Sequence, residues 1–305
     1  MGRLAFIFPG QGSQFVGMAK DLYDRCEDVK QTYKRANEIL GFDLAEICFN
    51  GPEEELKQTR VTQPAIFVHS ALLINFFSDK NIKPAMAAGH SLGEYSALYC
   101  AEALTFDDTL RLVKVRAELM QKAGEINKGT MAAFIGLQED VVAEVCESAS
   151  SAGVVQVANF NSPGQIVISG SVAGVNRAIE IAKEKGAKRA ILLGVGGAFH
   201  SPLMEYASEG LQKALAEVEI KPTSIPVYSN VHAKPITQPD EIRQLLAAQL
   251  TSPVQWLEIV RNMIQDGASE FYEVGPGSVL RGLLKRINRE VTGKSIGKLS
   301  DLENN

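Results

Sequence analysis

Residues 89–93 read Gly-His-Ser-Leu-Gly and stand between a short apolar run, 85–88, and a stretch with helical spacing, 92–103. Gly-x-Ser-x-Gly at a strand-to-helix turn is the pattern of a nucleophile elbow. Such a turn lifts the hydroxyl of Ser91 above the sheet and toward a helix N-terminus, where backbone N–H groups, that of Leu92 among them, stabilise an oxyanion. The alternative is a serine that only caps the helix. The pattern favours the nucleophile.

The segments around this pentapeptide alternate between strand-like and helix-like patterns. The runs 4–8 and 85–88 are short, apolar and followed by turn residues, as buried strands are. Helical spacing predicts helices over 17–38, 63–80, 92–103 and 107–123, the last with Met120 on its apolar stripe. Alternation of this kind predicts a largely parallel α/β sheet.

A second pattern begins near residue 126. Strand patterns at 130–137, 154–160, 165–169 and 187–194 enclose helix patterns at 139–150 and 172–185. The order β-α-β-β-α-β is ferredoxin-like. We therefore predict a small subdomain at 126–197, inserted into an α/β core domain that comprises 1–125 and 198–305.

The α/β alternation resumes after the predicted subdomain. Helices are expected at 201–217, 239–250 and 254–266, and strands at 225–229 and 270–274. The polar tail after Ile296 is expected to fray.

Composition narrows the class of protein. The chain has 305 residues, a net charge of −5 and a pI near 5.6, which argues against nucleic-acid binding. Its four cysteines are scattered without metal-ligand spacing, so we expect reduced thiols and neither metal nor disulfides. No signal peptide is recognisable, and no run approaches the ~18 apolar residues of a membrane span. We expect a soluble cytoplasmic protein without membrane contact.

A serine nucleophile needs a base that accepts its proton. The chain has four histidines. His69 lies in an apolar helix pattern, His232 follows a strand in a loop, and His90 adjoins Ser91 but points to the opposite face. His200 lies in a loop between a predicted strand and a helix, where α/β proteins collect catalytic groups. Elimination and context favour His200.

The N-terminal segment FPGQGSQ, residues 8–14, is a glycine-rich loop after the first strand. It lacks Gly-x-G-x-x-Gly because Phe15 stands where the last glycine would fall, so a dinucleotide site is disfavoured. The alternative is a loop that brings the backbone of Gln11 near Ser91 to complete an oxyanion hole.

Taken together, the motifs resemble the malonyl-CoA:acyl carrier protein transacylase family of fatty-acid synthesis. The matching pieces are FPGQGSQ (8–14), TQPAIF (62–67), GHSLGEYSAL (89–98), VKVRAELMQ (113–121), VANFNSPGQIVISG (157–170), GAFHSPLM (197–204), VYSNV (227–231), SPVQW (252–256) and YEVGPGSVL (272–280). The resemblance covers the chain to about residue 290. It implies a hydrolase-like α/β core with an inserted ferredoxin-like subdomain.

The resemblance also implies roles for particular residues. Ser91 would be acylated by malonyl-CoA with His200 as base, while Gln249 orients the imidazole through a carbonyl oxygen. The backbone N–H groups of Gln11 and Leu92 would form the oxyanion hole. Residues implied to contact the substrate are Arg116 at the malonyl carboxylate, Phe199 near the acyl α-carbon, and Asn159, with His90 and Met120 also counted among the substrate-binding residues.

The implied reaction is ping-pong transfer of malonyl through a serine ester to the phosphopantetheine thiol of an acyl carrier protein, without a cofactor. We expect a monomer whose basic patches meet the acidic carrier. Lys188 and Arg189 form one candidate docking face, and the C-terminal helix around Lys285 forms another. A polyketide-pathway malonyltransferase, a serine acyl hydrolase and an inactive carrier-binding module remain alternatives.

Overall fold

The computed structural model describes residues 2–303. A six-stranded sheet forms its centre, in the order β10-β9-β1-β2-β7-β8, with every neighbouring pair parallel except β7 and β8. Its strands are β1 (Arg3–Phe8), β2 (Met86–Gly89), β7 (Val227–Tyr228), β8 (Pro235–Ile236), β9 (Ala268–Val274) and β10 (Thr292–Ile296). The predicted parallel α/β core is confirmed.

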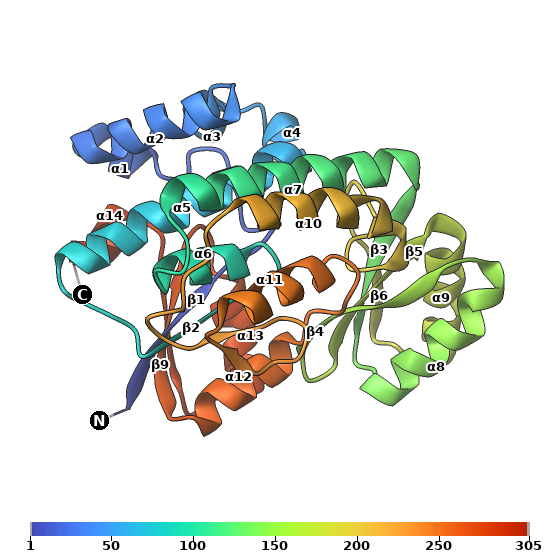
Figure 1. The fold of residues 1–305 in the computed structure, drawn as a ribbon. Helices are drawn as coiled ribbons and strands as arrows, with labels where there is room; N and C mark the ends of the chain where they lie inside the picture. The colour runs from blue at the N-terminus through green and yellow to red at the C-terminus, as the bar shows by residue number, and fades with distance from the viewer. Residues whose placement is uncertain (1, 304–305) are drawn as a thin grey trace.

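Helices cover the central sheet on both faces (Figure 1). The long helices α5 (Thr59–Asp79) and α7 (Phe106–Ile126) pack against each other, with α10 (Ser208–Glu217) beside α7. The helices α12 (Trp256–Gln265) and α13 (Val279–Ile287) lie against β9. The remaining helices of this part are α1 (Lys20–Arg25), α2 (Glu27–Leu40), α3 (Leu44–Asn50), α4 (Glu53–Leu56), α6 (Gly93–Cys100), α11 (Pro239–Ala248) and α14 (Leu299–Glu303).

A four-stranded antiparallel sheet stands at one end of the molecule (Figure 1). Its strands, in the order β4-β5-β3-β6, are β3 (Gly129–Ile135), β4 (Val155–Ser162), β5 (Gln165–Ser171) and β6 (Arg189–Leu192). The helices α8 (Glu139–Ala149) and α9 (Val172–Glu184) pack on it around a separate apolar cluster. This is the predicted β-α-β-β-α-β order. The boundaries at 126 and 197 stay a prediction.

Main-chain hydrogen bonds tie the small sheet to the core. The Phe160 N–H donates to the Val254 carbonyl over 2.9 Å, and the Val254 N–H donates to the Ala158 carbonyl over 2.8 Å. Strand β4 is thereby fixed to the chain just before α12. At this junction, strands of the small sheet and loops that follow β1 and β2 line one cavity.

Several element predictions were wrong in detail. Helix 17–38 is two helices, because Cys26 adopts an extended conformation between α1 and α2. Helix α5 begins at Thr59, before the predicted start at 63, and Pro64 lies inside the helix, where its missing N–H removes one intrahelical hydrogen bond. The segment 201–217 starts with a 3₁₀ helix, Pro202–Ala207. The tail does not fray throughout, because α14 buries Leu302.

Two composition-based expectations concerned the cysteines and membrane-spanning helices. The four cysteines form no disulfide. Helix α5 has the length and apolar composition of a membrane span, contrary to the expectation from sequence, but 83% of its most apolar stretch is buried inside the molecule. It therefore has the surroundings of a core helix.

Candidate active site

The predicted elbow joins β2 to α6. Ser91 has φ +52°, an uncommon conformation for a residue with a side chain. A Cβ on Gly89 would lie 1.9 Å from the carbonyl carbon of Gly93, and one on Gly93 would lie 2.1 Å from the Phe8 carbonyl oxygen. Both glycines are therefore required by close backbone approach. This close packing of backbone atoms places Ser91 at the start of α6.

Ser91 and His200 meet although 109 positions separate them in the chain. The Ser91 Oγ lies 2.8 Å from the His200 Nε2. The His200 Nδ1 lies 2.9 Å from the backbone carbonyl oxygen of Gln249. Since a carbonyl can only accept, Nδ1 carries the proton and Nε2 presents a lone pair to the serine hydroxyl.

The protonation state of His200 follows from its surroundings. Its side chain is buried, and burial lowers its pKa to about 3, with the positive charge of Arg116 acting in the same direction. The imidazole is therefore neutral at physiological pH and able to accept a proton. The other three histidines do not approach the serine hydroxyl in this way: His69 contacts the Gly297 carbonyl, His90 pairs with Asn161, and His232 faces Glu241.

Arg116, on α7, brings a buried cation to the same place. Its guanidinium is 1% exposed. Nη2 donates to the Ser91 Oγ over 3.0 Å and to the Gln249 Oε1 over 2.8 Å, while Nη1 donates to the Gln63 Oε1 over 2.7 Å. All these acceptors are neutral, and Nε has no hydrogen-bond partner in the described part of the chain. A buried charge with neutral acceptors is suited to an anionic ligand.

These groups line a cavity of about 200 Å³ between the two sheets. Ser91, His200 and Arg116 are joined there by other predicted residues, namely Gln11, His90, Leu92, Met120, Asn159 and Phe199. Further lining residues come from the small sheet and from α13, among them Val167, Leu193 and Leu280. The cavity thus combines a polar floor with apolar walls, as small-molecule sites do.

Gln249 lies behind the cavity, at the end of α11, and is fully buried. It contacts His200 through its backbone carbonyl and Arg116 through its side chain. Lys188 and Arg189 lie outside the cavity, exposed at the start of β6. Of the predicted site residues, only these two stand apart from the cluster.

Three residues of the cluster were not predicted. Gln63 accepts from Arg116, while Glu94 and Asn230 are fully buried beside the elbow. All three lie inside segments that carry the family resemblance, TQPAIF, GHSLGEYSAL and VYSNV. No spacing rule marks them, because their contacts depend on the tertiary fold.

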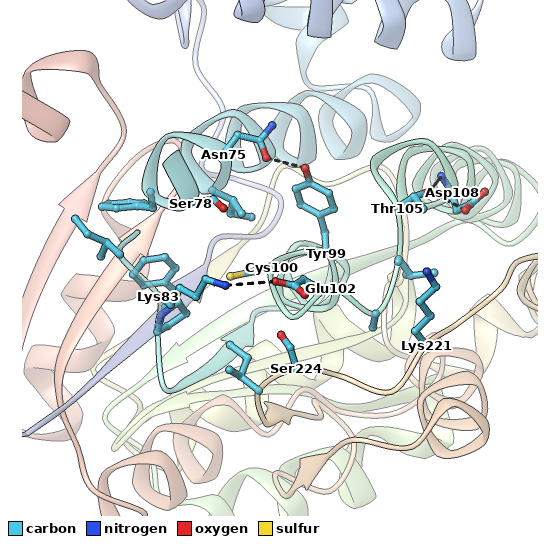
Figure 2. Close-up of a pocket in the computed structure, with 18 of the residues that line it drawn as sticks. Asn75, Ser78, Lys83, Tyr99, Cys100, Glu102, Thr105, Asp108, Lys221 and Ser224 are labelled. Atoms are coloured by element: carbon cyan, nitrogen blue, oxygen red, sulfur yellow. Dashed lines mark hydrogen bonds and ion pairs between the residues drawn. The ribbon is translucent and has the colours of Figure 1, made fainter. Parts of the chain in front are cut away.

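A second hollow, of about 300 Å³, lies among α5, α6 and the chain before β7 (Figure 2). Its labelled polar residues include pairs that contact each other, Tyr99 with Asn75 and Lys83 with Glu102. It contains none of the predicted site residues. The cavity at Ser91 is therefore the candidate active site.

A parallel α/β core with a serine at a strand-to-helix turn, within hydrogen-bond distance of a neutral histidine, is the arrangement typical of serine-dependent acyl enzymes. The acyl transferase domain family matches residues 5–300 of the chain. A malonyl CoA-acyl carrier protein transacylase of Bacillus subtilis is 45% identical, over 95% of this chain and 92% of its own length. One of Escherichia coli is 44% identical, over 98% and 97%.

Solved structures agree with these relatives. An acyl carrier protein S-malonyltransferase from Vibrio cholerae has a TM-score of 0.95 at 44% identity, covering 99% of both chains. A malonyl-transacylase in complex with a type II PKS acyl-carrier protein has a TM-score of 0.96 at 40% identity, covering 99% of this chain and all of that one. The chain belongs to the malonyl CoA-acyl carrier protein transacylases of the acyl transferase domain family.

Proposed function

We propose that this protein transfers a malonyl group from malonyl-CoA to the phosphopantetheine thiol of an acyl carrier protein, through an ester on Ser91. One observation carries the proposal: the Ser91 Oγ lies 2.8 Å from a neutral imidazole and 3.0 Å from the guanidinium of buried Arg116. The first contact suits nucleophilic attack, and the second suits an acyl group that carries its own carboxylate.

In the first half-reaction, the Ser91 Oγ attacks the thioester carbonyl carbon while its proton passes to the His200 Nε2. The carbonyl oxygen becomes an oxyanion, which the backbone N–H groups of Gln11 and Leu92 stabilise. Collapse breaks the C–S bond, and the proton on Nε2 passes to the departing CoA sulfur. The products are malonyl-Ser91 and free CoA, with His200 neutral again.

The second half-reaction reverses these steps with a different thiol. The phosphopantetheine S–H gives its proton to the His200 Nε2, and the sulfur attacks the ester carbonyl. When the C–O bond breaks, Ser91 Oγ recovers the proton. Both half-reactions use the same base and the same oxyanion site, as a ping-pong mechanism allows.

Arg116 selects malonyl in this scheme. The malonyl carboxylate would form charge-assisted bonds with the guanidinium, whose protein partners are neutral amide and hydroxyl oxygens. An acetyl group would offer the guanidinium no charge-assisted hydrogen bond. Phe199, Met120 and Asn159 line the same cavity and would enclose the acyl arm.

The polyketide alternative has one specific observation in its favour. The malonyl-transacylase in complex with a type II PKS acyl-carrier protein has the same fold and is 40% identical. The curated relatives are 41–45% identical and carry the transacylase name without a pathway. We place this chain in fatty-acid synthesis as a soluble, cytoplasmic, monomeric enzyme that requires no cofactor.

Radiolabelled malonyl-CoA tests the function directly. Wild-type protein is expected to form a base-labile malonyl adduct that moves to the carrier protein, and Ser91→Ala is expected to form none. Release of free malonate without transfer would instead identify a hydrolase. Absence of any adduct on the wild type would identify a binding module.

A further inference from the structure

Glu94 is a carboxyl group buried three residues after the nucleophile. Its exposure is 0%, and burial raises its pKa to about 7. It lies on the first turn of α6, where the other buried residues are uncharged, and this helix packs against β1 and β2. Burying a carboxyl group is costly. Its hydrogen-bond partners therefore indicate what it does.

The first partner is Gln249. The Gln249 Nε2 donates to the Glu94 Oε2 over 2.6 Å and to the Ser91 carbonyl oxygen over 3.0 Å. With the amide nitrogen held by two acceptors, the Gln249 Oε1 must face the Arg116 Nη2, which it accepts over 2.8 Å. Glu94 thus determines which way this amide points.

The second partner is Asn230. Its backbone N–H donates to the same Oε2 of Glu94 over 3.2 Å. The Asn230 side chain then holds the elbow on two sides: Oδ1 accepts from the Ser91 N–H over 2.6 Å, and Nδ2 donates to the Gly89 carbonyl over 2.7 Å. These bonds hold the unfavourable φ of +52° at Ser91.

The Glu94 Oε2 therefore joins two segments to the elbow: the chain just after β7, through Asn230, and the end of α11, through Gln249. Gln249 also carries the backbone carbonyl that orients His200. Displacing this oxygen would weaken the hydrogen bonds by which Asn230 holds Ser91. It would also weaken those by which Gln249 holds His200 and Arg116. Glu94 itself has no contact with the Ser91 hydroxyl or the His200 ring among the hydrogen bonds of the described residues.

We propose that Glu94 is a positioning residue for acyl transfer, which acts through Gln249 and Asn230 to hold Ser91, His200 and Arg116 in reactive geometry. The inference rests on the proposed function, because it assumes that Ser91 is acylated. It predicts that both half-reactions slow when no hydrogen-bond acceptor stands at the position of the Glu94 Oε2.

Two substitutions of similar size separate the effect of the hydrogen-bond acceptor from the effect of side-chain volume. Glu94→Gln keeps an oxygen that can take the place of Oε2, whereas Glu94→Leu removes it. Single-turnover acylation by malonyl-CoA gives an amplitude, which counts folded enzyme, and a rate constant, which reports geometry. We expect the rate constant to fall by about 100-fold in Glu94→Leu and by less than about 10-fold in Glu94→Gln.

Two further variants keep the test decisive. Glu94→Asp retains the charge but withdraws the acceptor by one methylene group, and we expect its rate constant to fall by about 10-fold or more. Should Glu94→Leu fail to fold, this variant carries the test. Val175→Ala, in the apolar cluster of the small sheet, is the control for lost packing, with an unchanged rate constant.

The outcomes separate the two proposals. Equal rate constants in wild type, Glu94→Leu and Glu94→Asp would overturn the positioning role, as would a loss confined to the amplitude. Labelling that persists in Ser91→Ala would instead overturn the serine-ester mechanism and leave the contacts of Glu94 to be explained by folding.

Discussion

At the scale of single residues, Arg116 is the group that would select the substrate in the proposed mechanism. Its guanidinium is 1% exposed and donates to Gln63, Ser91 and Gln249, none of which carries a charge. Its ring partner is Tyr95, whose centroid lies 5.5 Å away. Desolvation lowers the pKa of this arginine, yet a guanidinium stays protonated. An incoming carboxylate would thus meet a fixed and poorly hydrated cation.

Removing this cation should invert the acyl preference. Arg116→Ala is expected to lower kcat/KM for malonyl-CoA by about 100-fold or more, because a desolvated charge pair is lost. Acetyl-CoA should be used at least as well as by the wild type. The measurement is transfer of each acyl group to the carrier protein.

Arg111→Ala is the matched control for this experiment. Arg111 lies on the same helix, but it is exposed and paired with Asp107 and Asp108, so its loss should leave the acyl preference intact. Unchanged selectivity in Arg116→Ala would remove the arginine from the mechanism.

At the scale of elements, the strand-turn-helix unit of β2 and α6 positions Ser91 through close packing of its backbone segments. The atoms that a Cβ on Gly89 would meet belong to the main chain of Gly93 and Glu94. Main chain in a packed turn cannot rotate aside as a long side chain can. The glycines are therefore part of how Ser91 is held.

Gly89→Ala should accordingly destabilise the fold by about 3 kcal/mol, at the upper end of ordinary overpacking. Urea unfolding measures the change in the free energy of unfolding. Gly282→Ala is the contrasting variant, because it lies within α13 with open space at its Cβ position and should be neutral or slightly stabilising. Equal effects of the two variants would contradict the steric argument.

At the scale of the whole molecule, the cavity lies where the loops after β1 and β2 meet the small sheet, so we expect a carrier protein to approach along this junction. Lys188 and Arg189 are exposed at the start of β6, and the chain continues from this strand to Leu193 and Val195 on the cavity wall. A basic patch at this place suits an acidic carrier with a net-acidic enzyme.

Reversing these charges should separate the two half-reactions. The double variant Lys188→Glu/Arg189→Glu is expected to weaken transfer to the carrier by about 10-fold or more, mostly through slower association, while acylation by malonyl-CoA is unaffected. Lys20→Glu/Lys34→Glu, on α1 and α2 away from the small sheet (Figure 1), provides the control with the same charge change. Equal transfer rates in both variants would exclude this docking face.

The sequence alone determined the local features of this protein. Short apolar runs and turn residues predicted most strands, and helical spacing predicted the longer helices but not α3, α4 or α14. Gly-x-Ser-x-Gly marked the elbow. Each of these signals lies within a few neighbouring residues. Predictions failed where local signals compete, as at Cys26, whose extended backbone splits one helical pattern, and at Leu302, whose burial orders a polar tail.

Only the tertiary structure decided which distant groups meet. The family resemblance pointed to His200 and Gln249, but the roles of Glu94, Asn230 and Gln63 emerge solely from hydrogen bonds that span 53 to 155 positions of the chain. A buried amide or carboxyl group has no periodicity of its own. Its role is set by the partners that the fold brings within hydrogen-bond distance, since unpaired polar groups are costly to bury.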